Sequence, residues 1–181
     1  DVRIGCNHRG VMSRALRTFM PAERVPAGFE ILDKMYKLDE RGRRELYAVK
    51  GCAAGEAEVF EKLVHLGAPA GGVKLADALP ALEPDVAAQI AQFATMLDDA
   101  GVGAYAAWDP GVVRGIAYYT GFVFEVFDRQ GANRAVAGGG RYDQLIELFG
   151  GPKMPAVGFG MGDVVMEILL RERGRLPEHL L

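Results

Sequence analysis

The sequence predicts an α+β fold: a mainly antiparallel sheet with flanking helices, and a helical segment inserted after the first strand. Up to Gly103, apolar side chains mostly recur at the spacing of helices; after Gly103 they alternate with the period of strands. The later strands are separated by short turns, which join antiparallel neighbours. Glycine follows the same division, since 14 of the 24 glycines lie between Gly101 and Gly162.

The first half predicts one strand followed by helices. Residues 1–5 alternate like the end of a strand, and Asn7 is the expected N-cap of a helix over 8–19. Pro21 and Pro26 are expected to break that helical stretch. Four further helices are expected, over 29–36, 46–49 (the weakest), 55–66 and 84–99.

The second half predicts short strands and two late helices. The expected strands cover 104–108, 112–119, 122–128, 135–138 and 155–160. The expected helices cover 143–149 and 163–173, each followed by a glycine. The chain thereby divides into three segments: 1–19 begins the core, 20–103 is the helical insertion, and 104–181 completes the core.

Composition excludes several protein classes. Half of the residues are hydrophobic, enough for a folded core. No run of 18 uncharged apolar residues predicts a membrane span, no secretory leader is visible, and the absence of an initiator Met suggests a piece of a longer chain. Cys6 and Cys52 lack metal-ligand spacing, so no metal site is expected and both should be reduced thiols of a cytoplasmic protein.

Three strings could carry chemistry. The first, 113–121, places Arg114 inside an apolar run ahead of Tyr118 and Tyr119. On a strand Arg114 and Tyr118 would share one face, and a guanidinium there needs a carboxylate or phosphate partner. The alternative is an edge-strand arginine that reaches solvent. Glu125 is one candidate partner for an arginine or a substrate amine, and ordinary solvation is the alternative for this carboxylate.

The other two strings are rich in glycine. Gly138, Gly139 and Gly140 precede Arg141, Tyr142 and Asp143, and Gly158, Gly160 and Gly162 alternate along the last expected strand. Bare backbone allows a flat ligand to approach, so a nucleotide or amino-acid pocket is predicted. A simple turn, or close packing of another element, is the alternative. Asp143 is a further candidate partner for an arginine or a substrate amine.

Taken together, in this order and spacing, the strings 114–125, 137–143 and 155–162 resemble histidyl-tRNA synthetase. The start of the chain, 1–9, resembles the family strand that precedes its helical insertion. The resemblance implies the antiparallel sheet of class II synthetases, ATP-dependent activation of histidine, and transfer to tRNA(His). It also implies ATP with Mg²⁺ as substrate, no tightly bound cofactor, and a homodimer in the full-length protein.

The resemblance also implies roles for residues. Arg114 matches the catalytic arginine near the α-phosphate, and it also borders the histidine pocket with Tyr118, Tyr119 and Tyr142. The implied ATP or adenylate contacts are Gly138, Gly139, Gly140, Arg141, Gly158, Gly160 and Gly162. The chain carries a net charge of −3, whereas residues 1–50 carry 11 basic and 7 acidic side chains. The basic excess of this segment fits a surface near the tRNA acceptor arm.

Two positions depart from the family pattern. Ala117 stands where many members carry Asp, and Val165 stands where the arginine of motif 3 holds the γ-phosphate. The upstream motifs have no counterpart in these 181 residues, so this segment alone is expected to be nearly inactive. The alternative function is a paralogue that does not aminoacylate, such as the histidine-sensing regulatory subunit of ATP phosphoribosyltransferase. A binding-only domain of a larger regulatory protein is a third possibility.

Overall fold

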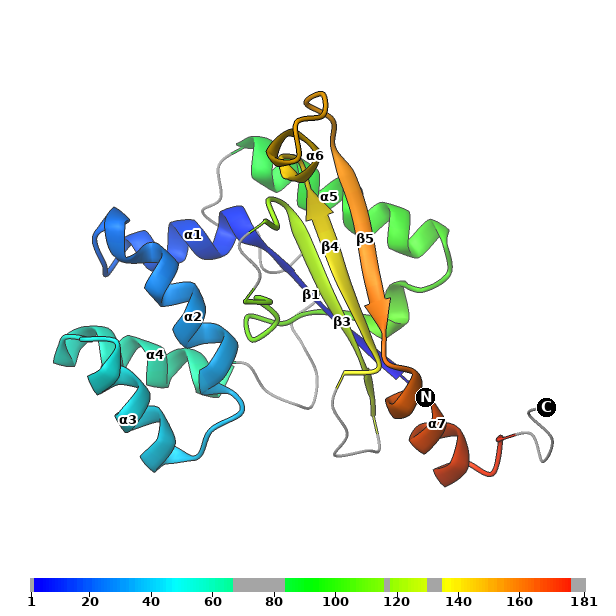
Figure 1. The fold of residues 1–181 in the computed structure, drawn as a ribbon, viewed down its shortest axis with the longest axis horizontal. Coiled ribbons are helices and arrows are strands. Elements are labelled where there is room, and N and C mark those ends of the chain that lie inside the picture. The colour runs from blue at the N-terminus through cyan, green and yellow to red at the C-terminus, as the bar shows by residue number, and fades with distance from the viewer. Residues whose placement is uncertain (1, 67–83, 116–117, 130–134, 177–181) are drawn as a thin grey trace.

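The computed structural model describes residues 2–66, 84–115, 118–129 and 135–176. Its centre is one sheet of five strands in the order β2-β1-β3-β4-β5 (Figure 1). All neighbouring strands are antiparallel except β1 and β2, which are parallel. The predicted α+β class with a mainly antiparallel sheet is confirmed. The strands are β1 (Val2–His8), β2 (Ala106–Trp108), β3 (Phe122–Asp128), β4 (Ala137–Tyr142) and β5 (Ala156–Met161).

The described α-helices agree in number and order with those expected. They are α1 (Arg9–Arg17), α2 (Val25–Met35), α3 (Glu40–Val49), α4 (Ala54–Leu66), α5 (Pro84–Asp99), α6 (Leu145–Leu148) and α7 (Asp163–Glu172). Helices α2 and α3 begin earlier than the apolar pattern indicated, because their first turns are largely polar or contain proline. The boundaries proposed for the segments 1–19, 20–103 and 104–181 stay predictions.

The junction of β1 and α1 differs from the expectation. His8, not Asn7, caps α1: its Nδ1 accepts a hydrogen bond from the N–H of Gly10 at 3.1 Å. Asn7 is fully buried within β1, where its Oδ1 accepts from the His8 N–H and its amide donates to the Pro110 carbonyl. Pro26 does not end a helix but lies in the first turn of α2, where its missing N–H has no helical partner to lose.

The strand expected over 112–119 is not formed by the described residues of that range. Arg114 has a φ of 46°, which is a left-handed conformation and not a strand conformation. The prediction that Arg114 and Tyr118 share a strand face is therefore wrong, and Ile116 lies outside the described residues. The apolar residues at the start of this range are explained by burial and not by a strand. Val112 packs with residues of the sheet and Val113 packs with the helices, so both are buried in a loop.

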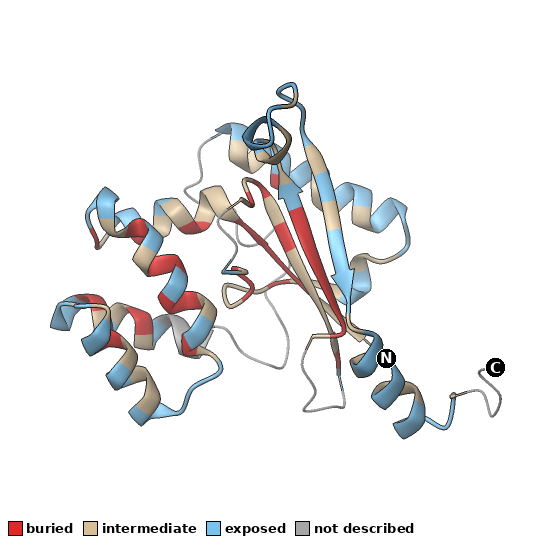
Figure 2. Ribbon diagram, viewed as in Figure 1, coloured by how far each residue is buried: buried red, intermediate tan, exposed pale blue. Residues whose placement is uncertain are grey.

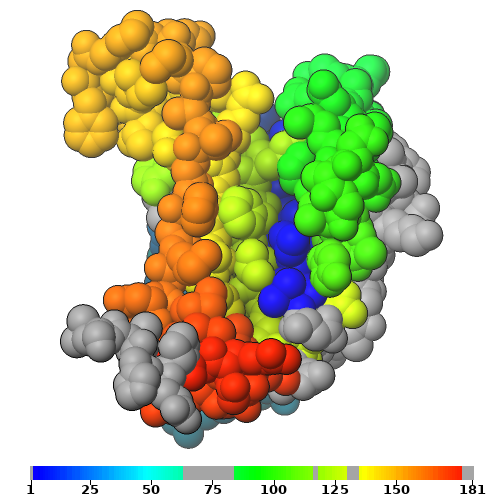
Figure 3. All heavy atoms as spheres, turned by 90° about the vertical axis from the view of Figure 1, so that its right-hand side faces the viewer, coloured from blue at the N-terminus to red at the C-terminus, as the bar shows by residue number. Residues whose placement is uncertain are grey.

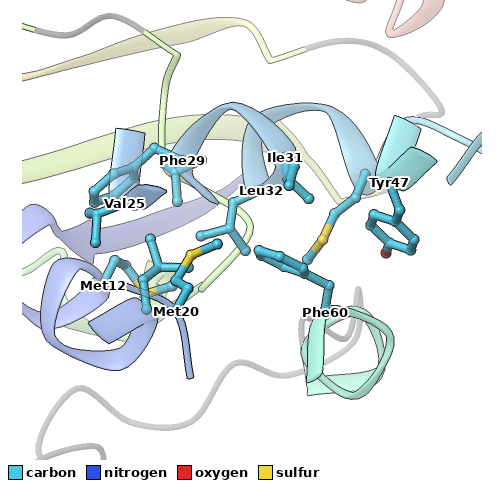
Figure 4. Close-up of a cluster of buried hydrophobic side chains, with 11 residues drawn as sticks. Met12, Met20, Val25, Phe29, Ile31, Leu32, Tyr47 and Phe60 are labelled. Atoms are coloured by element: carbon cyan, nitrogen blue, oxygen red, sulfur yellow. The ribbon is translucent and has the colours of Figure 1, made fainter. Parts of the chain in front are cut away.

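Helices α1 to α4 enclose a hydrophobic core of their own (Figure 4). Phe60 of α4 and Leu32 of α2 are both fully buried in it, and Tyr47 of α3 stacks on Phe60. Val113 belongs to the same core. The helical segment is therefore packed against the loop that carries Arg114. The core residues are Met12, Leu16, Met20, Val25, Phe29, Ile31, Leu32, Met35, Tyr47, Phe60 and Val113.

Helix α5 covers part of one face of the sheet. Its Ile90 is fully buried against Cys6 and Trp108, and the ring of Phe93 stacks on Phe122 with centroids 4.1 Å apart. The loop after β2 lies on the opposite face, between the sheet and α2 (Figure 1). Burial is concentrated in β4, in the ends of β1 and β3, and in α2, whereas the edge strand β5 is largely exposed (Figure 2).

Candidate functional site

Strand pairing determines which residues share a face of the sheet. Glu125 of β3 lies opposite Gly138 of β4, and Gly138 lies opposite Gly160 of β5. Gly140 lies two residues along β4 and faces the same way, because side chains alternate along a strand. The Arg114 side chain lies over this face, which we call the arginine face.

Arg114 forms an ion pair on this face. Its Nη1 donates to Glu125 Oε1 at 2.9 Å, and the two side chains are only 22% and 24% exposed. The predicted pairing of Glu125 with an arginine is therefore confirmed. Burial raises the pKa of Glu125, and the positive charge of Arg114 opposes that rise. Arg114 Nε is buried and has no hydrogen-bond partner among the described residues, so the guanidinium keeps an unfilled donor.

Three tyrosines lie together beside this pair. The ring centroid of Tyr118 is 4.8 Å from that of Tyr119 and 5.4 Å from that of Tyr142. Tyr119 is only 6% exposed, and burial raises its pKa while the nearby Arg114 charge lowers it. Phenol groups at the edge of a charged, half-buried site can hydrogen-bond a polar ring such as imidazole.

The glycines of this face make room for the protein's own side chains. A Cβ on Gly138 would lie 2.1 Å from Arg114 Nη1, and one on Gly140 would lie 2.7 Å from the Tyr119 ring. A Cβ on Gly158 would lie 2.4 Å from the Tyr142 hydroxyl, whereas one on Gly160 would meet no described atom within 4 Å. Three of these glycines therefore allow arginine and tyrosine to lie flat against the sheet.

Three predicted site residues lie away from Arg114. Gly139 faces the opposite side of the sheet, where a Cβ would approach the Gly158 carbonyl to 2.2 Å. Arg141 is exposed and also borders that side, which is hollowed by a groove of about 720 Å³ between α5 and β5 (Figure 3). Gly162 lies beyond the end of β5 and caps α7.

Asp143 has a clear partner. It accepts hydrogen bonds from Arg141 Nε at 2.8 Å and from the Thr120 hydroxyl at 2.9 Å. The Arg141 hydrogen bond is the main reason that its pKa lies below the ordinary value. The sequence prediction that Asp143 pairs with an arginine is confirmed. The hydrogen bond from Thr120 joins the segment before β3 to the end of β4.

Val165 occupies the position of the motif 3 arginine of the family, and no arginine of α7 substitutes for it. Val165 lies in the first turn of α7, close to Gly162. Arg171 pairs with Glu167 one turn away on the exposed helix surface, and Arg173 binds Asp128 at the end of β3. Ala117, the other departure from the family pattern, lies outside the described residues.

Two residues that sequence reasoning did not select contact the same loop. Arg9 Nη1 donates to the carbonyl oxygens of Val113 and Arg114, and Asp33 of α2 accepts from the Gly115 N–H. No local pattern marks them, because each contact joins positions more than 80 residues apart.

The described residues show two absences. They include no group of three His, Cys, Asp or Glu side chains arranged to hold a metal ion. None of their helices is both long enough and apolar enough to cross a membrane.

Comparison with known proteins supplies the relatives of this chain. A family model described as histidyl-tRNA synthetase matches residues 2–163. The chain belongs to the histidyl-tRNA synthetase family. The histidine–tRNA ligase of Haloarcula marismortui is 35% identical over 181 residues, which cover 98% of this chain and 41% of the relative.

Solved structures of this family share the fold. The histidyl-tRNA synthetase of Nostoc sp. PCC 7120 superimposes with a TM-score of 0.75 and 25% identity over 98% of this chain and 43% of that protein. The predicted class II synthetase-like fold is thereby confirmed. A second solved structure comes from Bacillus halodurans and is described as an ATP phosphoribosyltransferase regulatory subunit/histidyl-tRNA synthetase. It has a TM-score of 0.67 at 24% identity over 93% of this chain and 44% of that protein. Similarity at this level of identity shows the fold alone. The chain spans less than half the length of the curated relatives it matches.

Proposed function

We propose that this chain is part of the catalytic domain of a histidine–tRNA ligase. In that reaction a carboxylate oxygen of histidine attacks the α-phosphate of ATP, and the bond to pyrophosphate breaks. The resulting histidyl-adenylate then transfers its histidyl group to the 3′ end of tRNA(His), and AMP leaves. The observation that carries the proposal is Arg114 on the arginine face, beside the three tyrosines.

The chemistry of the arginine face suits adenylate formation. The attack builds negative charge on the α-phosphate, and a guanidinium that is permanently charged and half-buried stabilises such charge better than a hydrated one. Glu125 fixes one nitrogen of Arg114 and Tyr119 lies beside the guanidinium, so the donors that these two residues do not use could bind phosphate oxygens. Tyr118, Tyr119 and Tyr142 are the proposed contacts of the histidine side chain.

The proposed adenylate contacts depend on the family resemblance. Of the glycines on the arginine face, Gly160 has most room for a ligand, since no atom of the described residues lies within 4 Å of where its Cβ would be. Gly138, Gly140 and Gly158 take part indirectly, since they seat Arg114 and the tyrosines. ATP would bind together with Mg²⁺, and the reaction would take place in the cytoplasm in a homodimeric protein.

We propose tRNA(His) as a partner because the chain belongs to the histidyl-tRNA synthetase family, and not because of the charge of residues 1–50. Carboxylates outside residues 1–50 offset most of the basic excess of this segment. Arg24 and Arg43 pair with glutamates of α4, and Arg3 pairs with Asp109. Arg41 and Arg44 pair with glutamates inside the segment, and these pairs leave its net charge unchanged. A contact between this surface and the acceptor arm would therefore use few unpaired cations.

A regulatory subunit of ATP phosphoribosyltransferase is the second candidate. Val165 favours it, because no arginine of α7 is available for the γ-phosphate of ATP. Such a subunit would bind histidine without activating it. Arg114 and its half-buried partner Glu125 favour the ligase, since a binding-only site has less need of a cation prepared for phosphoryl charge.

Histidine-dependent exchange of pyrophosphate into ATP tests the proposal. The complete gene product that contains these 181 residues should catalyse this exchange. Arg114→Ala should reduce it by roughly 10²–10³-fold, the usual loss when one preorganised donor to a developing charge is removed. The thermal unfolding midpoint should change little. An unmutated protein that binds histidine yet catalyses no exchange would favour the regulatory candidate.

A further inference from the structure

The backbone at Arg114 needs external support. A φ of 46° is sparsely populated for a residue with a Cβ, and it persists only where surrounding contacts hold it. The same residue carries the guanidinium that lies over Gly138. Contacts that fix this turn therefore also fix where the guanidinium lies. We call the described residues 109–115 and 118–121 the arginine loop.

Arg9, the first residue of α1, contacts the arginine loop at two places. Its Nη1 donates to the Val113 carbonyl at 3.2 Å and to the Arg114 carbonyl at 3.5 Å. Its backbone N–H donates to the Gly121 carbonyl, so one residue contacts both the middle of the loop and its last residue. Among the described residues Arg9 has no carboxylate partner, which is unusual for a half-buried cation. Its hydrogen bonds go to this loop instead.

Helix α2 also contacts the loop. The Asp33 carboxylate accepts from the Gly115 N–H at 3.1 Å, next to the strained residue. Phe29, one turn earlier on α2, lies under the Arg9 guanidinium, with 3.8 Å between the guanidinium carbon and the ring centroid. One helix face therefore contacts Gly115 directly and Arg9 by stacking.

We propose that Arg9 and Asp33 are positioning residues that hold the left-handed turn at Arg114, and that α2 of the helical segment thereby determines where the catalytic arginine lies. This inference rests on the proposed function for its effect on catalysis. Neither residue touches the reacting atoms in this arrangement. Both act through the backbone of the arginine loop.

The test compares variants of α2 and Arg9 in the complete gene product. Arg9→Ala and Asp33→Ala should each lower the kcat of histidine-dependent pyrophosphate exchange by about 10²-fold, the loss expected when a reacting group moves by about 1 Å. The KM for histidine should change by no more than about threefold, because the lost interaction belongs to the transition state. Asp33→Asn should restore most of the rate, since its amide oxygen still accepts from Gly115.

Glu30→Ala is the matched control for Asp33→Ala. Glu30 is also a carboxylate of α2 in an ion pair, but its partner is Lys50 of the helical segment and not the arginine loop. Exchange in Glu30→Ala should equal that of the unmutated protein. A loss as large as that of Asp33→Ala would mean that any damage to α2 has this effect, and would overturn the proposal.

A double variant separates positioning from general structural damage. If Arg9 acts only through Arg114, Arg9→Ala should reduce exchange no further in a protein that already carries Arg114→Ala. A further loss of about 10²-fold in the double variant would overturn the proposal. Full activity of the single Arg9→Ala variant would overturn it as well.

A second readout does not need catalysis. Hydrogen–deuterium exchange of a peptide covering 112–115 should be faster in Arg9→Ala and Asp33→Ala than in Glu30→Ala or the unmutated protein. If the unmutated protein catalyses no pyrophosphate exchange, the proposed function fails, and this measurement alone decides whether Arg9 and Asp33 hold the loop. Equal exchange in all four proteins would show that they do not.

Discussion

Gly138→Ala should reduce activity far more than stability. The added Cβ would lie 2.1 Å from Arg114 Nη1 and 3.1 Å from Glu125 Cγ, whereas ordinary contact begins near 3.4 Å. The end of the guanidinium must therefore move by more than about 1 Å, and its bond to Glu125 must lengthen or break. A displacement of about 1 Å at a reacting group costs about 10²-fold in rate, equivalent to about 2.7 kcal/mol.

The stability terms for this variant nearly cancel. Weakening a partly exposed ion pair costs up to about 1 kcal/mol, while alanine in place of a strand glycine restricts the unfolded chain and returns roughly 0.4–1 kcal/mol. The atom that must move is the far end of a flexible side chain, so the sheet itself is undisturbed. The free energy of unfolding should therefore change by less than about 1 kcal/mol.

Two neighbouring glycines are the controls for Gly138→Ala. A Cβ on Gly139 would meet the Gly158 carbonyl at 2.2 Å, so Gly139→Ala must separate β4 from β5 and should cost about 3 kcal/mol or more. A Cβ on Gly160 would meet no atom of the described residues within 4 Å, so Gly160→Ala should stabilise the fold by roughly 0.4–1 kcal/mol. Urea unfolding and pyrophosphate exchange would be measured for all three. Exchange within about threefold of normal for Gly138→Ala would refute the reasoning, as would a Gly160→Ala variant that is as unstable as Gly139→Ala.

Two further predictions concern stability away from Arg114. Phe60→Ala should destabilise the helical segment by about 3–5 kcal/mol, because the fully buried ring would leave a cavity among α1 to α4; a loss below about 1 kcal/mol in urea unfolding would contradict that packing. Asp143→Asn should lower the unfolding midpoint at neutral pH, since the Arg141 hydrogen bond holds the pKa of the folded Asp143 below its ordinary value of 3.8. That contribution is present above pH 3.8 and is lost as the pH falls through the lower folded pKa, so the two proteins should converge in acid, and a difference that grows in acid would be inconsistent with it.

Sequence periodicity predicted the regular elements well where one face of an element is apolar. Helix α5 was predicted with its observed ends because its apolar stripe, Pro84 and Gly101 agree. The run around Val112 misled the prediction because its apolar residues are buried in two separate clusters and not on one strand. A period of two in so short a run does not distinguish a strand from a buried loop.

The site was predictable only as far as local strings and family resemblance reach. The cost of an unpaired guanidinium on the sheet predicted a carboxylate or phosphate partner for Arg114, and Glu125 was one of two candidate carboxylates; the structure shows that it is the partner. The contact between Arg9 and the loop spans more than 100 positions, and that of Asp33 spans 82. Nothing in the local sequence of either residue marks such a contact, because it depends on how α1 and α2 pack against the arginine loop.

Charging of tRNA(His) is the measurement that tests the central claim most directly. The complete gene product should transfer labelled histidine to this tRNA in the presence of ATP, and Arg114→Ala should lose the transfer while still folding. The contrary result is a folded protein that charges no tRNA yet makes an ATP phosphoribosyltransferase sensitive to histidine. That outcome would place the arginine face in a histidine sensor and not in a ligase.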